Sequence, residues 1–282
     1  MSQRHKLLSL SEISTIGASF RDDLSAYAAA GFDGIGIWEM KLGNDDVDLE
    51  ALRASGLRAT NCVPAVPSIL PNAVIEGPAD VEERIAALCT SMHRLARYEP
   101  DCVLCLTGPA EGLSVAATQS SEPRRVVVEG LKRIADAADR AGVRLGLEPI
   151  HRSQREALTV VTSIPEALDL LEEAGLTQVG IMVDLWHLWD TPDVERQLRD
   201  QIGRITGVHI SDWFADGRAE RALPGEGVSR TRELMAVLAG AGWTGAWDVE
   251  IFGDPNDPES FWSLPVDEAA RRAYEAAVGV LP

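Results

Sequence analysis

The chain has 282 residues, of which 45% are hydrophobic and 25% charged, and its 44 acidic and 26 basic residues give a formal net charge of −18. A surface this acidic repels phosphate backbones and anionic lipids, so we expect neither nucleic acid nor a membrane as a partner. No apolar run approaches the roughly 20 residues that span a bilayer, and "MSQRHKLLSLSEIST" lacks the features of a secretory signal, so we expect a cytoplasmic location.

Short apolar runs typical of β-strands alternate with longer helical patterns along the whole chain. The predicted strands cover residues 6–10, 34–38, 58–63, 102–106, 143–148, 179–184, 205–210 and 245–250. The clearest helical patterns cover residues 20–30, 80–98, 123–141, 163–175 and 228–242. In these stretches apolar residues recur at intervals of three and four, as on one face of an amphipathic helix. Ser163 and Glu166 form a good helix start, because serine caps the first turn and glutamate favours its positive end.

Eight alternations of strand and helix in a chain of this length favour an α/β fold, namely a single (β/α)₈ TIM barrel formed by residues 1–282 as one domain. The competing fold, a doubly wound open sheet, usually has a glycine-rich loop between its first strand and helix, whereas the glycines of "GFDGIGIW" precede or lie within the strand. In a barrel the loops that follow the strands open on one face, where active sites lie. Long loops over 64–79, 107–122 and 211–227 therefore predict a walled pocket on that face.

Cys102 and Cys105 have the CxxC spacing of some metal sites. They lie in a predicted strand, however, where side chains three positions apart face opposite sides. We therefore expect buried free thiols and no metal between them.

The last four predicted strands each end in an ionisable residue: Glu148, Asp184, His209 and Glu250. Neighbouring parallel strands would bring these side chains together at one rim of the barrel. Three carboxylates in one cluster repel each other, and a divalent cation removes that difficulty. Oxygen-rich ligation with one nitrogen suits Mn²⁺ or Mg²⁺, with Co²⁺ and Zn²⁺ as alternatives. Four such residues thus predict one divalent metal ion at the strand ends.

The segments "EPIHR", "DLWH", "GVHISD" and "DVEIFGD" follow each other in this order. In layout and motifs nearly the whole chain resembles the xylose-isomerase-like TIM-barrel superfamily of sugar isomerases and epimerases, which includes ketose 3-epimerases and inosose dehydratases. The resemblance implies that Glu148 and Glu250 bind the metal and also act as acid and base on opposite faces of the substrate. It implies that Asp184 and His209 are the other two metal ligands.

The resemblance also implies residues that bind substrate. His187, three residues after the aspartate, and Arg221, in "RALPGEG", would contact substrate hydroxyls. The ketose 3-epimerases have a second glutamate at the position of Gln154, which can form hydrogen bonds but cannot carry a proton at neutral pH. His151 is the candidate to compensate for this difference.

Three further residues have two readings each. Trp38 and Trp186 fall at or just past strand ends, where they either form apolar walls against a sugar ring or pack beneath the loops. Asp212 either orients His209 or begins the loop that follows it.

A metal that stabilises an enediolate permits several outcomes. Returning the proton to the other face epimerises a keto sugar, returning it to the next carbon isomerises it, and loss of a β-substituent makes the enzyme a lyase. We therefore expect an isomerase or epimerase of a small keto sugar or polyol, with an inosose-type dehydratase or a 3-keto-glycoside β-eliminating deglycosidase as the alternative. A metal-dependent endonuclease is disfavoured by the acidic charge and by only five histidines, and a silent sugar-binding protein by the complete ligand set. The apolar, tryptophan-containing C-terminal segment predicts either a homo-oligomer or a helix packed on its own barrel.

Overall fold

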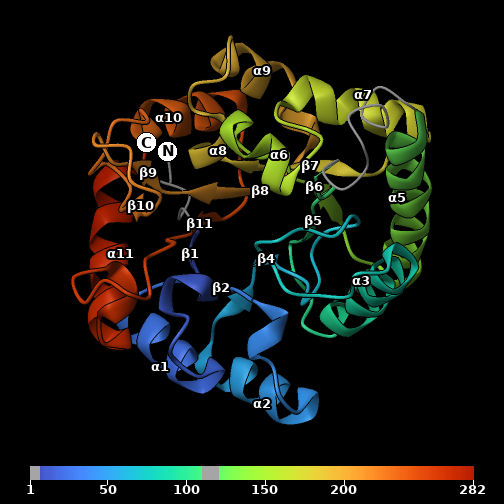
Figure 1. Ribbon diagram of the computed structural model, residues 1–282. Coiled ribbons are helices and arrows are strands. Elements are labelled where there is room, and N and C mark those ends of the chain that lie inside the picture. The colour runs from blue at the N-terminus through green and yellow to red at the C-terminus, as the bar shows by residue number, and fades with distance from the viewer. Residues whose placement is uncertain (1–6, 110–120) are drawn as a thin grey trace.

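Parallel strands form a barrel at the centre of the molecule, with helices around its outside (Figure 1). The computed structural model describes residues 7–109 and 121–282. The strands of the barrel are β1 (Leu8–Ser11), β2 (Gly34–Gly36), β3 (Arg58–Ala59), β4 (Asn61–Cys62), β5 (Cys102–Cys105), β6 (Leu145–Leu147), β7 (Gly180–Asp184), β8 (Ile205–Ile210) and β11 (Trp247–Val249). Their order in the sheet is β3-β2-β1-β11-β8-β7-β6-β5-β4, and every printed pairing among them is parallel.

The ring closes at Thr60, which separates β3 from β4. Its amide donates to the carbonyl of Ile35 at 3.0 Å, and its own carbonyl accepts from the amide of Cys102 at 3.2 Å. The two short strands are therefore halves of the single strand predicted over 58–63, and they join β2 on one side to β5 on the other. The predicted barrel is confirmed, and the predicted strand limits agree to within two residues across the part of the chain that the structure describes.

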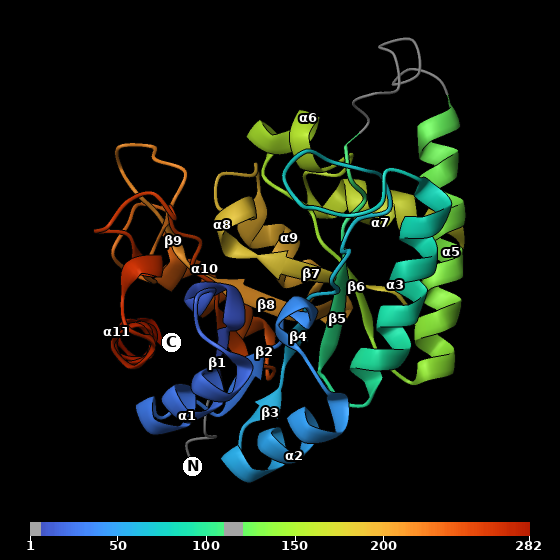
Figure 2. The same cartoon turned by 60° about the horizontal axis from the view of Figure 1, so that its bottom comes forward.

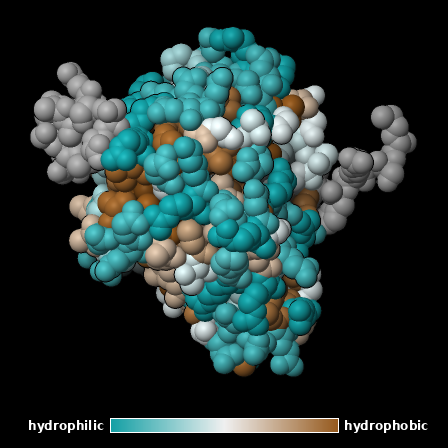
Figure 3. Space-filling model, turned by 90° about the vertical axis from the view of Figure 1, so that its right-hand side faces the viewer, coloured by the Kyte–Doolittle hydropathy of each residue, from teal (hydrophilic) through white to brown (hydrophobic). Residues whose placement is uncertain are grey.

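The helices on the outside are α1 (Phe20–Ala30), α2 (Asp45–Ser55), α3 (Val81–Ala96), α5 (Ser121–Ala141), α7 (Ile164–Ala174), α9 (Val194–Asp200), α10 (Thr231–Ala241) and α11 (Val266–Val280). The five clearest helical patterns are confirmed to within three residues. Helix α7 shows why: Ser163 accepts a hydrogen bond from the amide of Glu166, and Gly175 ends the helix in the left-handed conformation. The outward surface over α3 and α5 is largely hydrophilic (Figure 3), as expected for helices that bury only one face.

Helix α11 covers the barrel beside β1 and packs against α1. Its buried face is made of small side chains, among them Ala269, Ala273 and Ala277, which allow close approach. Tyr274 on this helix meets Phe32 edge to face, with ring centroids 5.3 Å apart. The C-terminal segment thus packs on its own barrel, while the predicted homo-oligomer stays a prediction.

The barrel interior is tightly filled by side chains. Gly207 on β8 is required there, because a Cβ atom would lie 2.3 Å from Oδ1 of Asn61. Cys102 and Cys105 are buried and free as predicted, with Cys102 facing the interior, where its thiol contacts Thr206 Oγ1 at 3.3 Å. No helix in the described ranges has the length and apolar composition needed to cross a membrane.

The loops after the strands gather at one end of the barrel with the short helices α6 (Arg155–Leu158) and α8 (Leu185–Leu188) (Figure 2). The loop predicted over 211–227 contains an antiparallel hairpin of β9 (Asp212–Trp213) and β10 (Arg221–Ala222). Of the loop predicted over 107–122, residues 110–120 lie outside the described residues, as does Lys6 of the first predicted strand.

Candidate active site

The four ionisable residues at the strand ends meet at the rim of the barrel. Glu148 and Glu250 directly follow β6 and β11, Asp184 ends β7, and His209 lies opposite it on β8 in the strand register. These strands are consecutive neighbours in the sheet. All four side chains are buried, so their charges interact strongly with one another.

Three of the four could hold one ion. A carboxylate oxygen of Glu148, one of Asp184 and a ring nitrogen of His209 all lie within 4.8 Å of one another. Neither ring nitrogen of His209 makes a hydrogen bond of good geometry among the described residues, but both face buried carboxylates, with Nδ1 3.3 Å from Glu250 Oε2 and Nε2 3.6 Å from Asp248 Oδ2. A divalent cation bound by the imidazole would offset the repulsion among these acids. The donor set of two carboxylates and one imidazole therefore fits a divalent metal.

Glu250 lies outside this group of three because its carboxylate is bonded to Arg221. Nη1 of Arg221 donates to Oε2 of Glu250 at 2.9 Å and to Oδ2 of Asp184 at 2.7 Å. The buried guanidinium thus supplies a positive charge between two carboxylates predicted to bind metal. Arg221 was predicted to contact substrate. The structure places it in the lining of the cavity, where it is also hydrogen-bonded to Asp184 and Glu250.

Trp38 helps to orient Glu250 from the other side. Its indole Nε1 donates to Ser11 Oγ at 2.9 Å. An indole nitrogen can only donate, so the hydroxyl of Ser11 is left to donate to Oε1 of Glu250, at 3.4 Å.

The acids and the imidazole have strongly shifted pKa values. Burial raises the pKa of Glu148 to about 8. Burial acts to lower the pKa of His209, but the surrounding carboxylates, Glu250 first, raise it to about 10. Burial acts to raise the pKa of Glu250, but His209 and Arg221 lower it to about 2. Glu250 is therefore held as a carboxylate and Glu148 as an acid near neutral pH.

Asp248 is a residue that sequence reasoning did not single out. It lies two positions before Glu250 on β11, is fully buried, and faces the barrel interior, with its Oδ2 3.6 Å from Nε2 of His209. Burial raises its pKa to about 7. The period of two in "DVE" was the available signal, since alternate residues of a strand face one side.

Asp212 belongs to the loop that follows β8, which is the second of the two roles considered for it. Its carboxylate accepts from the amides of Gly225 and Ser229, at 3.1 and 2.7 Å. It therefore shapes the loop before α10. Since the amide of Val228 also donates to the carbonyl of Trp213 at 2.9 Å, Val228 and Ser229 are held against the hairpin, and α10 begins three residues later than the predicted helix.

His187 is buried beside Arg221 and is kept neutral. Burial lowers its pKa well below the usual range. Its Nδ1 accepts from the amide of His151 at 3.1 Å, so in the neutral ring the proton lies on Nε2.

The ring of His151 does not line the cavity. Its Nδ1 and Nε2 lie 2.7 Å from Ser153 Oγ and 3.2 Å from Asp190 Oδ1. Only its backbone reaches toward the site, through His187. The expectation that its side chain compensates for Gln154 is not supported by this placement.

A cavity of about 590 Å³ opens above the rim. Glu148, His187, Arg221 and Glu250 line its base, and Gln154, Trp38 and Trp186 lie on its walls. Oε1 of Gln154 is buried without a hydrogen-bond partner among the described residues, so it is free to accept from a ligand. Trp186 is held by stacking on Trp213, with ring centroids 4.4 Å apart. Both predicted tryptophans therefore form walls of the cavity.

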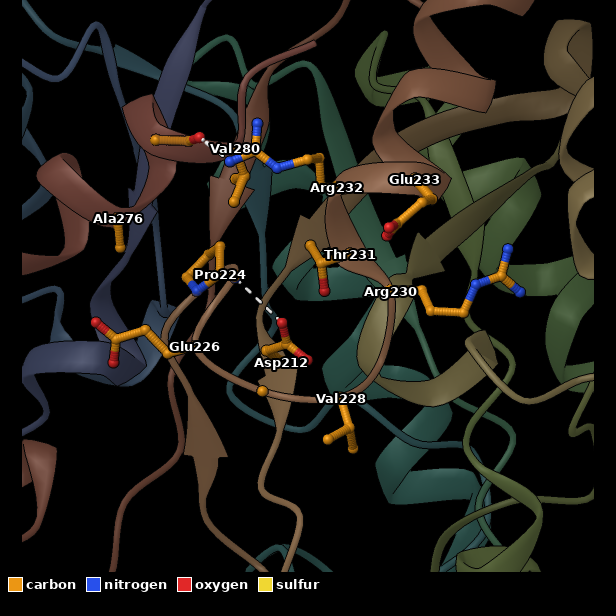
Figure 4. A pocket seen from close by; sticks show the side chains of 13 residues that line it. Asp212, Pro224, Glu226, Val228, Arg230, Thr231, Arg232, Glu233, Ala276 and Val280 are labelled. Atoms are coloured by element: carbon orange, nitrogen blue, oxygen red, sulfur yellow. Dashed lines mark hydrogen bonds between the residues drawn. The ribbon is translucent and has the colours of Figure 1, made fainter.

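A second hollow, of about 470 Å³, lies between the start of α10 and the end of α11 (Figure 4). Asp212, Arg230, Thr231 and Glu233 are among its lining residues, and none of the predicted site residues is. It is separate from the ionisable cluster.

A family model described as "Xylose isomerase-like TIM barrel" matches residues 24–276. An inosose isomerase of Halalkalibacterium halodurans is 27% identical over 170 residues, which is 57% of this chain and 56% of that protein. A D-psicose 3-epimerase of Agrobacterium fabrum is 27% identical over 125 residues, or 44% of this chain and 40% of that protein. The chain thus spans about half the length of these curated relatives. A 3-dehydroshikimate dehydratase of Pseudomonas aeruginosa is 24% identical over 258 residues, covering 85% of this chain and 37% of that protein.

Solved structures share the fold over the whole chain. Protein SMc04130 from Sinorhizobium meliloti has a TM-score of 0.84 and 25% identity, covering 97% of this chain and 98% of that one. The IOLI protein, solved with a zinc atom, has a TM-score of 0.78 and 21% identity, covering 98% of both chains.

Proposed function

Because the chain belongs to the xylose isomerase-like TIM barrel family, we propose that it is a divalent-metal-dependent isomerase or epimerase. It would act on a small keto sugar or polyol through an enediolate. One observation carries the metal dependence: a ring nitrogen of the buried His209 and carboxylate oxygens of Glu148 and Asp184 all lie within 4.8 Å of one another. Mn²⁺ or Mg²⁺ suits this oxygen-rich set, with Co²⁺ and Zn²⁺ as alternatives.

The proposed ligands are Glu148, Asp184 and His209, with Glu250 as the fourth. Glu250 is included because it is buried at the end of the strand next to that of His209, although its Oε2 is hydrogen-bonded to Arg221. A divalent cation held there supplies Lewis-acid stabilisation for the negative charge that develops when a proton next to a carbonyl is removed.

Glu148 and Glu250 are the proposed acid and base. Arg221 and His209 keep Glu250 ionised, so it can accept a proton from a carbon next to the carbonyl. Glu148, the second carboxylate of the cluster, would return a proton to the substrate.

Other cavity residues would bind the substrate. His187 and Arg221 line the base of the cavity and would contact substrate oxygens there. Gln154 offers its unpartnered Oε1 to a hydroxyl hydrogen. These three side chains lie on the lining of one cavity.

Proton exchange tests this proposal. The protein is incubated with free keto sugars and keto-inositols in D₂O, and deuterium next to the carbonyl is followed by NMR. We expect Mn²⁺-dependent incorporation that chelation abolishes and added Mn²⁺ restores. Glu148→Gln should remove it, whereas Glu226→Gln, an exposed glutamate of the hollow in Figure 4, should not. Full exchange after exhaustive dialysis against chelator would contradict the metal dependence.

The second candidate is a lyase on the same site. It is favoured by the dehydratase relative, whose match covers 85% of this chain. The same incubations separate the two reactions by product. Deuterium in a sugar of inverted or shifted configuration supports the isomerase or epimerase, and an enone or a released aglycone supports the lyase.

A further inference from the structure

The cavity above the rim has two chemically different halves. The ionisable half contains Glu148, His187, Arg221 and Glu250. A second part of the lining, here called the apolar half, is formed by Val63, Ile75, Leu104, Leu106 and Leu158. The ionisable residues follow β6, β7 and β11 or lie in the hairpin after β8, and the apolar ones come chiefly from β5 and the segments that follow β4 and β5.

The apolar half is a continuous surface. Val63, Leu104 and Leu106 belong to one buried cluster inside the barrel mouth. Ile75, Leu158 and Trp38 pack on that cluster while remaining partly open. Burial of such side chains by a ligand would be favourable, because apolar surface is removed from water.

Apolar side chains continue to the outer edge of the cavity. Met40 and Val74, which line it, are 61% and 63% exposed. They are the two most exposed large hydrophobic residues in the described parts of the chain. Exposed apolar residues gathered at a pocket mark a binding surface.

A free sugar does not match this apolar half. Each hydroxyl that is buried without a partner loses its hydrogen bonds to water at a cost. Outside the ionisable half, the described lining residues offer few polar groups to a ligand. These are the side chains of Glu76 and Gln154 and the indole nitrogens of three tryptophans. Two of these nitrogens, in Trp38 and Trp262, already donate to Ser11 Oγ and Ile251 O. A cavity of this volume takes a ligand larger than a single sugar ring.

Aromatic rings connect the two halves. The ring of Phe252 lies under the guanidinium of Arg221, with its centroid 4.5 Å from Cζ of the arginine. Its ring is also 6.0 Å from that of Trp38 and 6.1 Å from that of Trp262. A flat substituent attached to a sugar bound at Arg221 would meet these rings first.

We propose that the substrate is a keto sugar that carries an apolar, preferentially aromatic, substituent. The sugar occupies the ionisable half and the substituent the apolar half. This inference rests on the proposed function for the sugar end, and it excludes small free ketoses as the preferred substrates.

A matched pair of ligands tests the apolar half without turnover. Methyl and phenyl β-D-glucoside differ only in the substituent, and neither has the carbonyl needed for the reaction. Their dissociation constants for the Mn²⁺-loaded protein are measured by calorimetry. We expect the phenyl compound to bind about tenfold or more tightly. Equal affinity, or tighter binding of the methyl compound, would overturn the inference.

Two variants locate the preference. Ile75→Ser and Leu158→Ser, each made on the full chain and checked for folding by circular dichroism, should reduce the phenyl preference at least threefold. Val228→Ser, which alters an exposed apolar residue of the hollow in Figure 4, should leave it unchanged. A preference that persists in both folded variants would place the substituent elsewhere and defeat the inference.

Deuterium exchange on the 3-keto forms of the two glucosides separates the two proposals. Metal-dependent exchange with no phenyl preference in binding or rate would keep the proposed function and reject the apolar substituent. A phenyl preference that the variants abolish, with no exchange under any metal, would keep the ligand class and reject the proposed function.

Discussion

His209 is the central residue of the proposed metal site. It lies between two buried carboxylates, 3.3 Å from Glu250 Oε2 and 3.6 Å from Asp248 Oδ2. A histidine that binds metal through one ring nitrogen is usually oriented by a partner at the other. Asp248 is therefore the group that would fix the ring and its tautomer.

Replacing Asp248 tests this orientation. Asp248→Asn keeps the shape of the side chain but removes its charge, so we expect Mn²⁺ affinity to fall about 10- to 100-fold. Calorimetric titration of the metal-free protein with Mn²⁺ measures it. Asp190→Asn alters the comparable aspartate beside His151, away from the cluster, and should bind Mn²⁺ as the unmodified protein does. Unchanged affinity in Asp248→Asn would show that the ring needs no such partner.

Proton release should accompany metal binding. The metal-free protein at pH 7 carries protons on Glu148, with a pKa of about 8, and on His209, with a pKa of about 10. Both must give up a proton to act as ligands, so binding at pH 7 releases protons and the affinity rises with pH. Calorimetry in two buffers of different ionisation enthalpy counts the protons. Binding that releases none would exclude this ligand pair.

A buried ion network connects the first elements of the barrel. The 3₁₀ turn Glu12–Thr15 follows β1, and its residues Glu12 and Thr15 contact Lys41 and Asp23. Lys41 Nζ donates to Asp23, to the carbonyl of Thr15 at 3.0 Å and to that of Glu12 at 3.3 Å. Burial raises the pKa of Glu12 well above its usual range and also raises that of Asp23. Since Glu12 accepts from the amide of Trp38, this network also holds a wall of the cavity.

Removing the lysine should destabilise the fold. Lys41→Met leaves buried carboxylates without their cation, so we expect a loss of about 3–5 kcal/mol in the free energy of unfolding at pH 7. The pKa values of Glu12 and Asp23 are higher in the folded state than in the unfolded state. Ionisation of these two acids therefore lowers the free energy of unfolding as pH rises above about 4, and it has no effect below that pH. Urea unfolding at pH 5 and 8 should therefore show a smaller loss at pH 5. Lys132→Met, which removes an exposed lysine paired with Glu129, should cost less than about 1 kcal/mol.

At the scale of the whole molecule, the first and last strands of the barrel are neighbours in one sheet. Strand β1 pairs with β11 in parallel, with Leu8 opposite Trp247. We propose on this ground that residues 1–282 form one domain. The proposed metal ligands lie at the C-terminal ends of β6, β7, β8 and β11, so a bound ion would link the second half of the barrel to the strand that closes it.

A divalent ion should therefore raise the unfolding temperature. An ion present at 100 times its dissociation constant adds about 2.7 kcal/mol to the stability of the folded state, which shifts the midpoint by several degrees in a protein of this size. Differential scanning calorimetry with Mn²⁺, then with excess chelator, measures the shift and its reversal. His209→Ala should show none, and a shift that survives in this variant would mean that the ion binds elsewhere.

The barrel, the order of its elements and the four ionisable strand ends could be predicted from the amino-acid sequence. These features depend on local patterns: apolar runs, periods of three and four residues, caps such as Ser163, and the chain order of Glu148, Asp184, His209 and Glu250. Local patterns survive in any packing, which is why the strand limits agree to within two residues in the described ranges.

Which charges meet, and where the cavity is apolar, became visible in the folded chain alone. Arg221 reaches Asp184 and Glu250 from a hairpin, Asp248 comes to lie beside His209, and the ring of His151 is directed away from the cavity. Strand register and side-chain rotamers set these contacts, and both result from packing between segments far apart in the chain. The apolar half has the same origin, because its residues come from separate strands and loops that only the closed barrel brings together.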